Sequence, residues 1–407
     1  MGIRHRAIVA MLAAALVGGR VAEANQFRLF VAQDSTFDDN VFRLPPGATP
    51  SAQATGVARP PLGEMRFTTS AGLGFDTVYR RQRPRAEFTL TRYAHQTYKY
   101  LDFTGISGRA GWHSSIGDRW TGTMGYERTQ APSNDATQTG FRTANRLDER
   151  IAGEAEYRVY SRWSVGGSLN KVGSRYNNTV SRFSDYDAKQ AAAHVAYRSR
   201  RGNQFRVLAR GTDGGYSSRS VSHEGIPAQS YVQLDYEADI TWVPTGHSRV
   251  GARLGFSRFD YGALAPAFRN FEGVTGRVAY DWTPTEQSTI GVVVRREIGP
   301  ELLYYANATV VGTTAASVTA TSALSPKIGL RAAAELRRQM LAGQAGALDG
   351  PLRSPDYAQL TVTGTWTPKH YLLFSMAVGH ERRRGPSPHS PDFNANTVSA
   401  HLQWSFL

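Results

Sequence analysis

Apolar and polar side chains alternate strictly in the C-terminal segment Thr397–Leu407, where every second residue from Val398 to Phe406 is apolar. Successive side chains of a β-strand point to opposite faces, so this period of two predicts a strand with one apolar and one polar face. Outer-membrane barrels end on such a strand, which pairs with the first strand to close the sheet. A soluble β-sandwich can also end in this way, and the rest of the chain decides between the two folds.

The same alternation recurs along the whole chain and predicts a long series of strands. The clearest early strands, and a later one that is poorer in aromatic residues, are Gln26–Ser35, Phe67–Val78, Ala86–Tyr98, Thr104–His113, Trp120–Arg128 and Asn307–Ser322. The polar connection Phe37–Gly63, rich in proline and glycine, follows the first strand, and the basic segment Arg80–Arg85 is expected to be a short turn.

Short and long connections alternate between these strands. Turns such as Pro244–Gly246 are followed by longer links such as Asp260–Asn270, and one short link near Lys99–Asp102 is the exception. This alternation is typical of an up-and-down barrel with tight periplasmic turns and long outer loops. The sequence therefore predicts an all-β fold: a transmembrane up-and-down antiparallel β-barrel of about 18 strands.

Three Trp-x-Pro motifs begin at Trp242, Trp282 and Trp366. Proline lacks the N–H that a strand ladder needs, so each motif is expected to end its strand at a short turn. The spacing of the motifs also suits a β-propeller, but each repeat holds two long strands instead of four short ones. Trp and Tyr side chains at one level suit the headgroup boundary of a membrane, although they can also cap the core of a soluble sandwich. The predicted aromatic girdle consists of Tyr157, Tyr197, Trp242, Trp282, Trp366 and Trp404.

The N-terminal segment Met1–Ala24 has the pattern of a secretory signal peptide. A basic start at Arg4–Arg6 precedes the apolar run Ala7–Val17 and the A-x-A motif Ala22–Ala24. The apolar run is too short to span a bilayer. We therefore expect a signal peptide at residues 1–24, a barrel at residues 25–407, and a location in the outer membrane of a Gram-negative bacterium.

Composition narrows the classes of protein further. The chain has no cysteine, which in an exported protein argues against a disulfide-stapled fold and against thiolate metal sites. Lysine and arginine number 47 against 33 acidic residues, a formal net charge of +14 that falls to +12 without the three arginines and one glutamate of the signal peptide. The basic residues are spread along strands and turns, and the signal peptide directs the chain away from nucleic acid, so no nucleic-acid partner is expected.

The sequence contains no recognisable catalytic, cofactor or metal motif. It has no metal-ligand spacing, no Walker-type loop and no nucleophile elbow. Membrane barrels can be enzymes, but no convergent set of serine, histidine and acidic residues stands out. We therefore expect no enzyme activity, no cofactor and no bound metal.

Charged residues recur on the face opposite the apolar one in many predicted strands. The residues expected to line the lumen are Arg206, Arg210, Arg253, Arg277, Arg295, Arg331, Arg337, Asp235, Glu237 and Asp239. Charged side chains inside a wide barrel indicate a water-filled or ion-paired lumen in place of a packed core. Two interpretations stay open, a passage for solutes and a wall that salt bridges merely stiffen.

Two polar-aromatic segments carry a family resemblance. Phe37–Pro45 reads FDDNVFRLP, with Asp38, Asp39, Asn40 and Phe42, and Tyr100–Thr104 reads YLDFT, with Tyr100, Leu101, Asp102 and Phe103. Together with the Trp-x-Pro turns, these segments resemble the EpsL-type outer-membrane protein of exopolysaccharide biosynthesis loci associated with the exosortase B/PEP-CTERM system. The similarity extends over nearly the whole chain that follows the signal peptide.

The resemblance implies a role in the synthesis or export of an extracellular polysaccharide, as a passage or a scaffold in the outer membrane. The alternatives are a general or sugar-specific porin and, third, a lipid-modifying barrel enzyme. The expected partners are outer-membrane lipid and lipopolysaccharide, the exopolysaccharide, and the barrel-assembly machinery.

Overall fold

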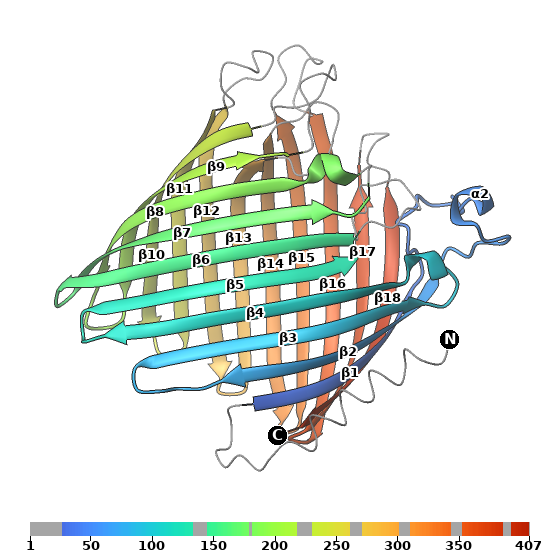
Figure 1. Cartoon of the computed structure of the whole chain (residues 1–407), viewed down its shortest axis with the longest axis horizontal. Coiled ribbons are helices and arrows are strands. Elements are labelled where there is room, and N and C mark those ends of the chain that lie inside the picture. Colours follow the sequence, from blue (N-terminus) through green and yellow to red (C-terminus); the bar gives the residue numbers. More distant parts are fainter. Residues whose placement is uncertain are drawn as a thin grey trace.

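The computed structural model describes residues 27–132, 145–178, 181–217, 230–260, 271–300, 310–342, 352–385 and 392–406. These residues form one antiparallel sheet of 18 strands that closes on itself as a barrel (Figure 1). The predicted fold class and strand number are thus confirmed. The predicted signal peptide at residues 1–24 lies outside the described residues.

Every strand pairs with its neighbours in the chain, and the first pairs with the last. The strands are β1 (Phe27–Asp38), β2 (Glu64–Asp76), β3 (Gln82–His95), β4 (Phe103–Ile116), β5 (Trp120–Pro132), β6 (Asn145–Tyr160), β7 (Trp163–Tyr176), β8 (Tyr186–Arg198), β9 (Gln204–Gly215), β10 (Ser230–Thr245), β11 (Ser248–Asp260), β12 (Phe271–Thr285), β13 (Ser288–Pro300), β14 (Val310–Ser325), β15 (Ile328–Ala342), β16 (Leu352–Lys369), β17 (Leu372–Arg384) and β18 (Phe393–Phe406). Within the described residues, three short helical segments, α2 (Ala52–Thr55), η1 (Lys99–Leu101) and η2 (Ser181–Ser184), lie in connections between strands.

The barrel closes where β1 and β18 pair as antiparallel strands, from Leu29 opposite Phe406 to Asp38 opposite Thr397. A closed sheet has no free edge, so every backbone N–H and C=O of the wall can be paired inside the bilayer. The predicted role of the C-terminal strand in closing the sheet is therefore confirmed. The pairing also brings the start of β1 and the end of β18 to the same end of the barrel, seen at the bottom of Figure 1.

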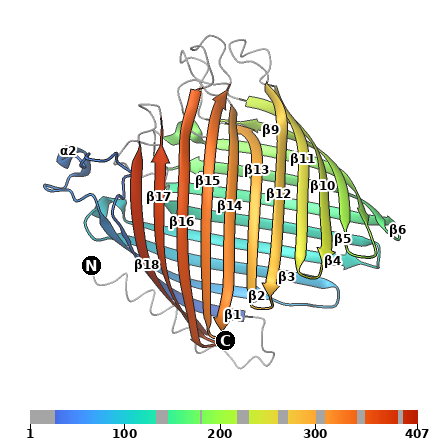
Figure 2. The same ribbon diagram turned by 180° about the vertical axis from the view of Figure 1, so that it is seen from behind.

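The two ends of the barrel differ in their connections. Tight turns such as 246–247 and 286–287 join strands at one end, called here the short-turn end, and the longer connections lie at the other, the long-loop end (Figures 1 and 2). The aromatic-poor strand expected near Asn307–Ser322 is present as β14. Figures 1 and 2 also show α2, which belongs to the first long connection, projecting beyond the wall at the side of the barrel.

Two local expectations need correction. The Trp-x-Pro prolines do not end their strands, because Pro244, Pro284 and Pro368 lie inside register shifts that follow each tryptophan, and the strands continue to the turn. A bulge leaves one residue without a ladder partner, which is how a strand accommodates proline. The segment Arg80–Arg85 is not all turn either, because β3 already begins at Gln82 and includes Pro84.

Alternation along each strand separates an apolar outer face from a polar inner face. On β10, Leu234 and Tyr236 expose 42% and 58% of their surface, whereas the intervening Asp235 is only 4% exposed. Large exposed apolar side chains of this kind recur on strands around the whole sheet. An apolar band of this extent suits the hydrocarbon of a bilayer and would be unstable in water. Within the described residues, no helix is both long enough and apolar enough to cross a membrane.

Candidate functional site: the charged inner wall

The inner wall carries an ion-paired row on β9, β10 and β11. Asp239 lies opposite Arg206 on one side and opposite Arg253 on the other. Its carboxylate accepts from Nη2 of Arg206 at 2.7 Å and from Nε of Arg253 at 2.6 Å. The register of three neighbouring strands thus places one carboxylate between two arginines, which is the pairing expected for directly opposed charges in a sheet.

A second row lies next to the first, toward the long-loop end. Nη2 of Arg210 is 3.2 Å from Glu237, and Nε of Arg253 is 3.4 Å from the same carboxylate. Asp235 accepts a hydrogen bond from the hydroxyl of Ser257 at 2.6 Å and lies 3.9 Å from Arg210. Six of the ten residues predicted to line the lumen are therefore brought together in one network over three strands.

The row continues into a stretch of like charge. Arg253 lies opposite Arg277, and Arg277 lies opposite Arg295 on the next strand. Arg295 reaches Glu335 at 3.6 Å, whereas Arg277 forms no salt bridge with any residue that the structure describes. Like charges directly opposite each other are unfavourable in a sheet. Arg253 and Arg295 are each paired with two carboxylates, so Arg277 is the arginine of this stretch whose charge no salt bridge among the described residues compensates.

Arg331 and Arg337 lie apart from this network. The guanidinium of Arg337 lies 4.4 Å from the centre of the Tyr357 ring, a cation–π contact. Arg331 lies between Thr321 and Thr363 in the strand register and forms no salt bridge with the described residues. The predicted lumen residues therefore divide into one dense network and several arginines distributed along the wall.

At the long-loop end, Arg43 ties the first connection to the wall. Its Nη1 donates to Asp38 of β1 at 2.7 Å, and its Nε donates to Glu381 of β17 at 3.0 Å. Arg43 adopts a left-handed backbone conformation with φ of 54°, which L-residues seldom occupy and which the surrounding contacts must hold. Burial works against the charge of this guanidinium, but Asp38 and Glu381 outweigh it and raise the pKa of Arg43.

The neighbouring residues of the first connection bind the start of β18. The Asn40 amide donates to the carbonyls of Leu44 at 2.8 Å and Asn394 at 2.9 Å. Asp39 accepts from both the backbone N–H and the side-chain amide of Asn396, each at 2.7 Å. Residues 39–44 therefore cross over the seam where the barrel closes.

The two segments that carry the family resemblance meet at this place. The ring of Phe42 packs edge-on against Tyr98 at a centroid distance of 4.7 Å, and Tyr98 is fully buried. Tyr98 donates a hydrogen bond to the carbonyl of Pro61, and its ring contacts Tyr100. Burial, with the neighbouring charges, raises the pKa of Tyr100 to about 12.

The rest of the second segment completes the start of β4. Asp102 accepts from the backbone N–H of His95 at 2.8 Å, and the ring of Phe103 stacks on Tyr93. Leu101 ends the 3₁₀ segment η1, the short link that the sequence showed as an exception. The polar-aromatic segments therefore fold together as an ordered structure at the long-loop end.

The predicted girdle residues lie on the outer face near the short-turn end. Trp242, Trp366 and Trp404 each expose about half of their surface, and Tyr157 and Tyr197 pack against Trp120 and Trp163. Trp282 is 42% exposed at the equivalent place on β12. Trp120 and Trp163 were not in the predicted girdle. Each begins a strand next to a short turn, and this position in the sequence could have identified both as girdle residues.

The charged inner residues of β2–β4 were not among the residues predicted from the sequence. Arg109 bonds Glu87 at 2.7 Å, and Arg83 binds both carboxylate oxygens of Asp76. Alternation along these strands would have placed the four side chains on the polar face. No group of three or more His, Asp or Glu residues that could hold a metal ion occurs within the described parts of the chain.

Neither the protein-family models nor the curated proteins give a match to this chain. Among solved structures, the chain is similar to the Pseudomonas aeruginosa protein OpdK with vanillate, at 9% identity and a TM-score of 0.50, with 93% of this chain and 99% of that one covered. It is equally similar to OccK5 (OpdH) of the same organism, at 9% identity and a TM-score of 0.50, covering 94% and 99%. A bacterial polysaccharide outer membrane secretin matches at 11% identity over 95% of this chain and all of that one, with a TM-score of 0.39.

These similarities concern the fold alone. A closed antiparallel barrel of 18 strands with an apolar outer face is an architecture of the Gram-negative outer membrane. The chain is therefore an outer-membrane β-barrel, as the alternation of its side chains predicted.

Proposed function

We propose that this barrel provides a passage for an extracellular polysaccharide across the outer membrane. Barrels of about 16 to 18 strands are wide enough to enclose an aqueous channel. In outer-membrane barrels the short turns face the periplasm and the long loops face outward, and we give this barrel the same orientation. A polymer would enter past the short turns and leave past the segments that Arg43 holds.

The observation that carries the proposal is the charged inner wall of β9–β13. Arg206, Arg253 and Arg295 keep 29%, 41% and 35% of their side-chain surface exposed, so these side chains are not packed as a core. A polymer must slide, and sliding needs many weak polar contacts in place of one tight site. Arginines that are partly neutralised by carboxylates offer such contacts to hydroxyl and acidic groups of sugars.

The resemblance of Phe37–Pro45 and Tyr100–Thr104 to the EpsL-type proteins supports a polysaccharide as the transported solute. The second candidate function is a porin for small anions. Arg277, which forms no salt bridge with the described residues, favours it, because uncompensated positive charge on the wall concentrates anions of any size.

A deletion strain separates the two functions. With the gene removed, the proposal predicts that polymer is lost from the medium or retained in the periplasm, while uptake of small nutrients stays normal. Restoring the wild-type chain should restore secretion. Normal polymer in the medium, together with slowed uptake of small anions, would reject the polysaccharide passage in favour of the porin.

A further inference from the structure

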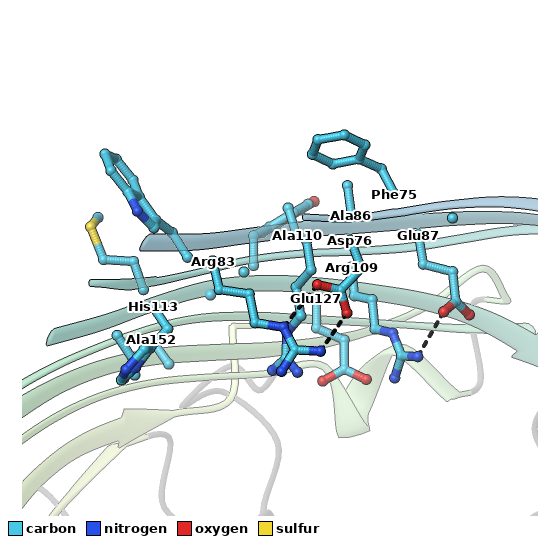
Figure 3. Close-up of a pocket in the computed structure, with 18 of the residues that line it drawn as sticks. Phe75, Asp76, Arg83, Ala86, Glu87, Arg109, Ala110, His113, Glu127 and Ala152 are labelled. Atoms are coloured by element: carbon cyan, nitrogen blue, oxygen red, sulfur yellow. Dashed lines mark hydrogen bonds and ion pairs between the residues drawn. The ribbon is translucent and has the colours of Figure 1, made fainter. Parts of the chain in front are cut away.

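A hollow of about 930 Å³ lies in the wall of β1–β6 toward the short-turn end, on other strands than the network around Asp239. Its volume is within the range of about 300–1,000 Å³ that is usual for ligand pockets. Figure 3 shows Phe75 and Ala86 on one side of the wall and the charged groups, Asp76, Arg83, Glu87, Arg109 and Glu127, on the other. The hollow therefore opens on the polar, inner face.

The hollow exists because consecutive inner positions lack long side chains. Gly111, Gly125 and Ala152 lie opposite one another on β4, β5 and β6 and form its floor. At Gly125, an added Cβ would meet only the carbonyl oxygen of Ala110 at 3.7 Å, an ordinary contact. At Gly111, an added Cβ would lie 3.0 Å from Nε of Arg85, so the Arg85 side chain lies across this part of the floor.

Arginines outnumber carboxylates around this floor. The hollow is lined by five arginines and three carboxylates, an excess of two positive charges. Both oxygens of Asp76 bind Arg83, at 2.8 and 2.7 Å, although Arg85 is the residue opposite Asp76 in the strand register. Arg85 therefore forms no salt bridge with the residues that the structure describes.

A second arginine without a salt bridge, Arg150, lies on the other side of the floor. Glu87 is shared by Arg109, at 2.7 Å, and Arg28, at 3.7 Å. The next carboxylate, Glu127, lies between Arg109 and Arg150 in the register, and Arg150 forms no salt bridge with the described residues. Two guanidinium groups, of Arg85 and Arg150, thus border an open, glycine-floored hollow, each opposite a carboxylate, of Asp76 and Glu127, with which it forms no salt bridge.

We propose that this hollow binds an oxyanion carried on a sugar, and specifically the carboxylate of an acidic saccharide, held by Arg85 and Arg150 over Gly111 and Gly125. Guanidinium groups bind carboxylates and phosphates through paired hydrogen bonds, and the glycine floor leaves room for the sugar ring. Its position places it toward the short-turn end of the lumen, the end by which a solute from the periplasm would enter. The inference rests on the proposed function for its choice of a saccharide.

Calorimetric titration of the purified full chain in detergent tests the site with three probes: trigalacturonate, glucose 6-phosphate and neutral maltotriose. Binding of trigalacturonate without binding of maltotriose is the expected result, and tighter binding of glucose 6-phosphate than of trigalacturonate would overturn the choice of a carboxylate. Arg85→Gln and Arg150→Gln should each weaken acidic-probe binding by about tenfold, the effect of losing one hydrogen bond to a charged group.

Gly125→Leu tests the hollow without changing its charge, and Gly251→Leu is its matched control. Gly251 lies on the inner face of β11, where an added Cβ would meet only Ala279 at 3.9 Å. The first variant should abolish acidic-probe binding and the second should leave it unchanged, with heat-modifiable gel migration showing that both are folded. Equal binding of maltotriose, or unchanged binding in Gly125→Leu and both arginine variants, would overturn the site.

Failure of the site and failure of the proposed function are distinguishable. If the deletion strain secretes normal polymer while the titration results hold, the polysaccharide passage is rejected and the oxyanion site stands. If secretion requires the protein but Gly125→Leu and both arginine variants bind acidic probes like the wild type, the site is rejected and the passage stands.

Discussion

Arg43 and Glu381 are 338 positions apart in the chain, yet Nε of the arginine lies 3.0 Å from a carboxylate oxygen of the glutamate. The same guanidinium holds Asp38 at 2.7 Å. Because Asp38 belongs to β1 and Glu381 to β17, the contact spans β18 and ties the first long connection across the seam of the barrel. The Arg43 side chain thus joins the first long connection to both strands that flank β18.

Arg43→Gln should loosen residues 39–44. The N–H of Leu44 bonds to the Asn40 side chain and the N–H of Asp39 bonds to the Asn396 carbonyl, and both depend on the local fold that Arg43 holds. We expect amide hydrogen exchange in this segment to accelerate by about tenfold, since losing a partly buried charged hydrogen bond lowers the local opening free energy by about 1.5 kcal/mol. Arg338→Gln, which breaks an exposed pair with Asp356, is the control. Unchanged exchange at residues 39–44 in Arg43→Gln would show that Arg43 does not hold this segment.

Removal of Val398–Leu407 should prevent assembly. Strand β18 pairs with both β17 and β1, so its loss opens two edges whose backbone groups cannot be satisfied in lipid. We expect the truncated chain to be degraded in the periplasm and absent from outer-membrane fractions on immunoblots. Deletion of Ala52–Thr55, which removes α2 and no strand, should leave outer-membrane levels normal. Wild-type levels of the truncated chain would refute the closing role of β18.

Asp239→Asn should destabilise the barrel and make its lumen more basic. The substitution leaves Arg206 and Arg253 facing each other across β10 without the carboxylate that both bind. We expect a loss of about 1–3 kcal/mol in urea unfolding from lipid vesicles, the usual cost of removing one partner of a buried charged pair. Asp118→Asn, at a solvent-exposed pair with Arg81, should have no measurable effect. An unfolding midpoint equal to the wild type would show that the network adds nothing to stability.

Tryptophan fluorescence should report the level of the girdle. All seven tryptophans of the chain lie toward the short-turn end of their strands on the exposed outer face. Because indole rings prefer the headgroup boundary, lipids brominated near the glycerol should quench the fluorescence more than lipids brominated near the chain ends. Stronger quenching by the deep bromines would place these residues inside the hydrocarbon and contradict the girdle.

Most of the fold was predictable because strand periodicity is a local property. The alternation Val398 to Phe406 was enough to predict a one-sided strand, and the alternation of turn lengths was enough to predict an even-stranded barrel. The exact ends of the strands were not predictable, because Pro244 and its equivalents lie in bulges that depend on the neighbouring strand. Pairing with the neighbouring strand therefore determines where these strands end, although the missing N–H of proline suggested that they end earlier.

The site was predictable only in part. Period-two alternation assigned Arg206, Asp239 and Arg253 to one face, but their mutual contact depends on the registers of three strands, which the sequence alone does not specify. The bond between Arg43 and Glu381 and the hollow over Gly111 and Gly125 depend on contacts between distant segments. In the sequence, Gly111 and Gly125 are ordinary strand glycines, and only the pairing of β4 with β5 shows that they lie side by side.

Planar-bilayer recording under a salt gradient tests the passage most directly. The account predicts an open-channel current that favours anions, that weakens in selectivity as salt screens the wall, and that shifts toward cations when Arg253 and Arg277 become Glu. Arg43→Gln should conduct at least as well as the wild type. Folded, heat-modifiable protein that carries no current either as wild type or as Arg43→Gln would contradict the account, because the ion-paired inner wall would then be a closed structure.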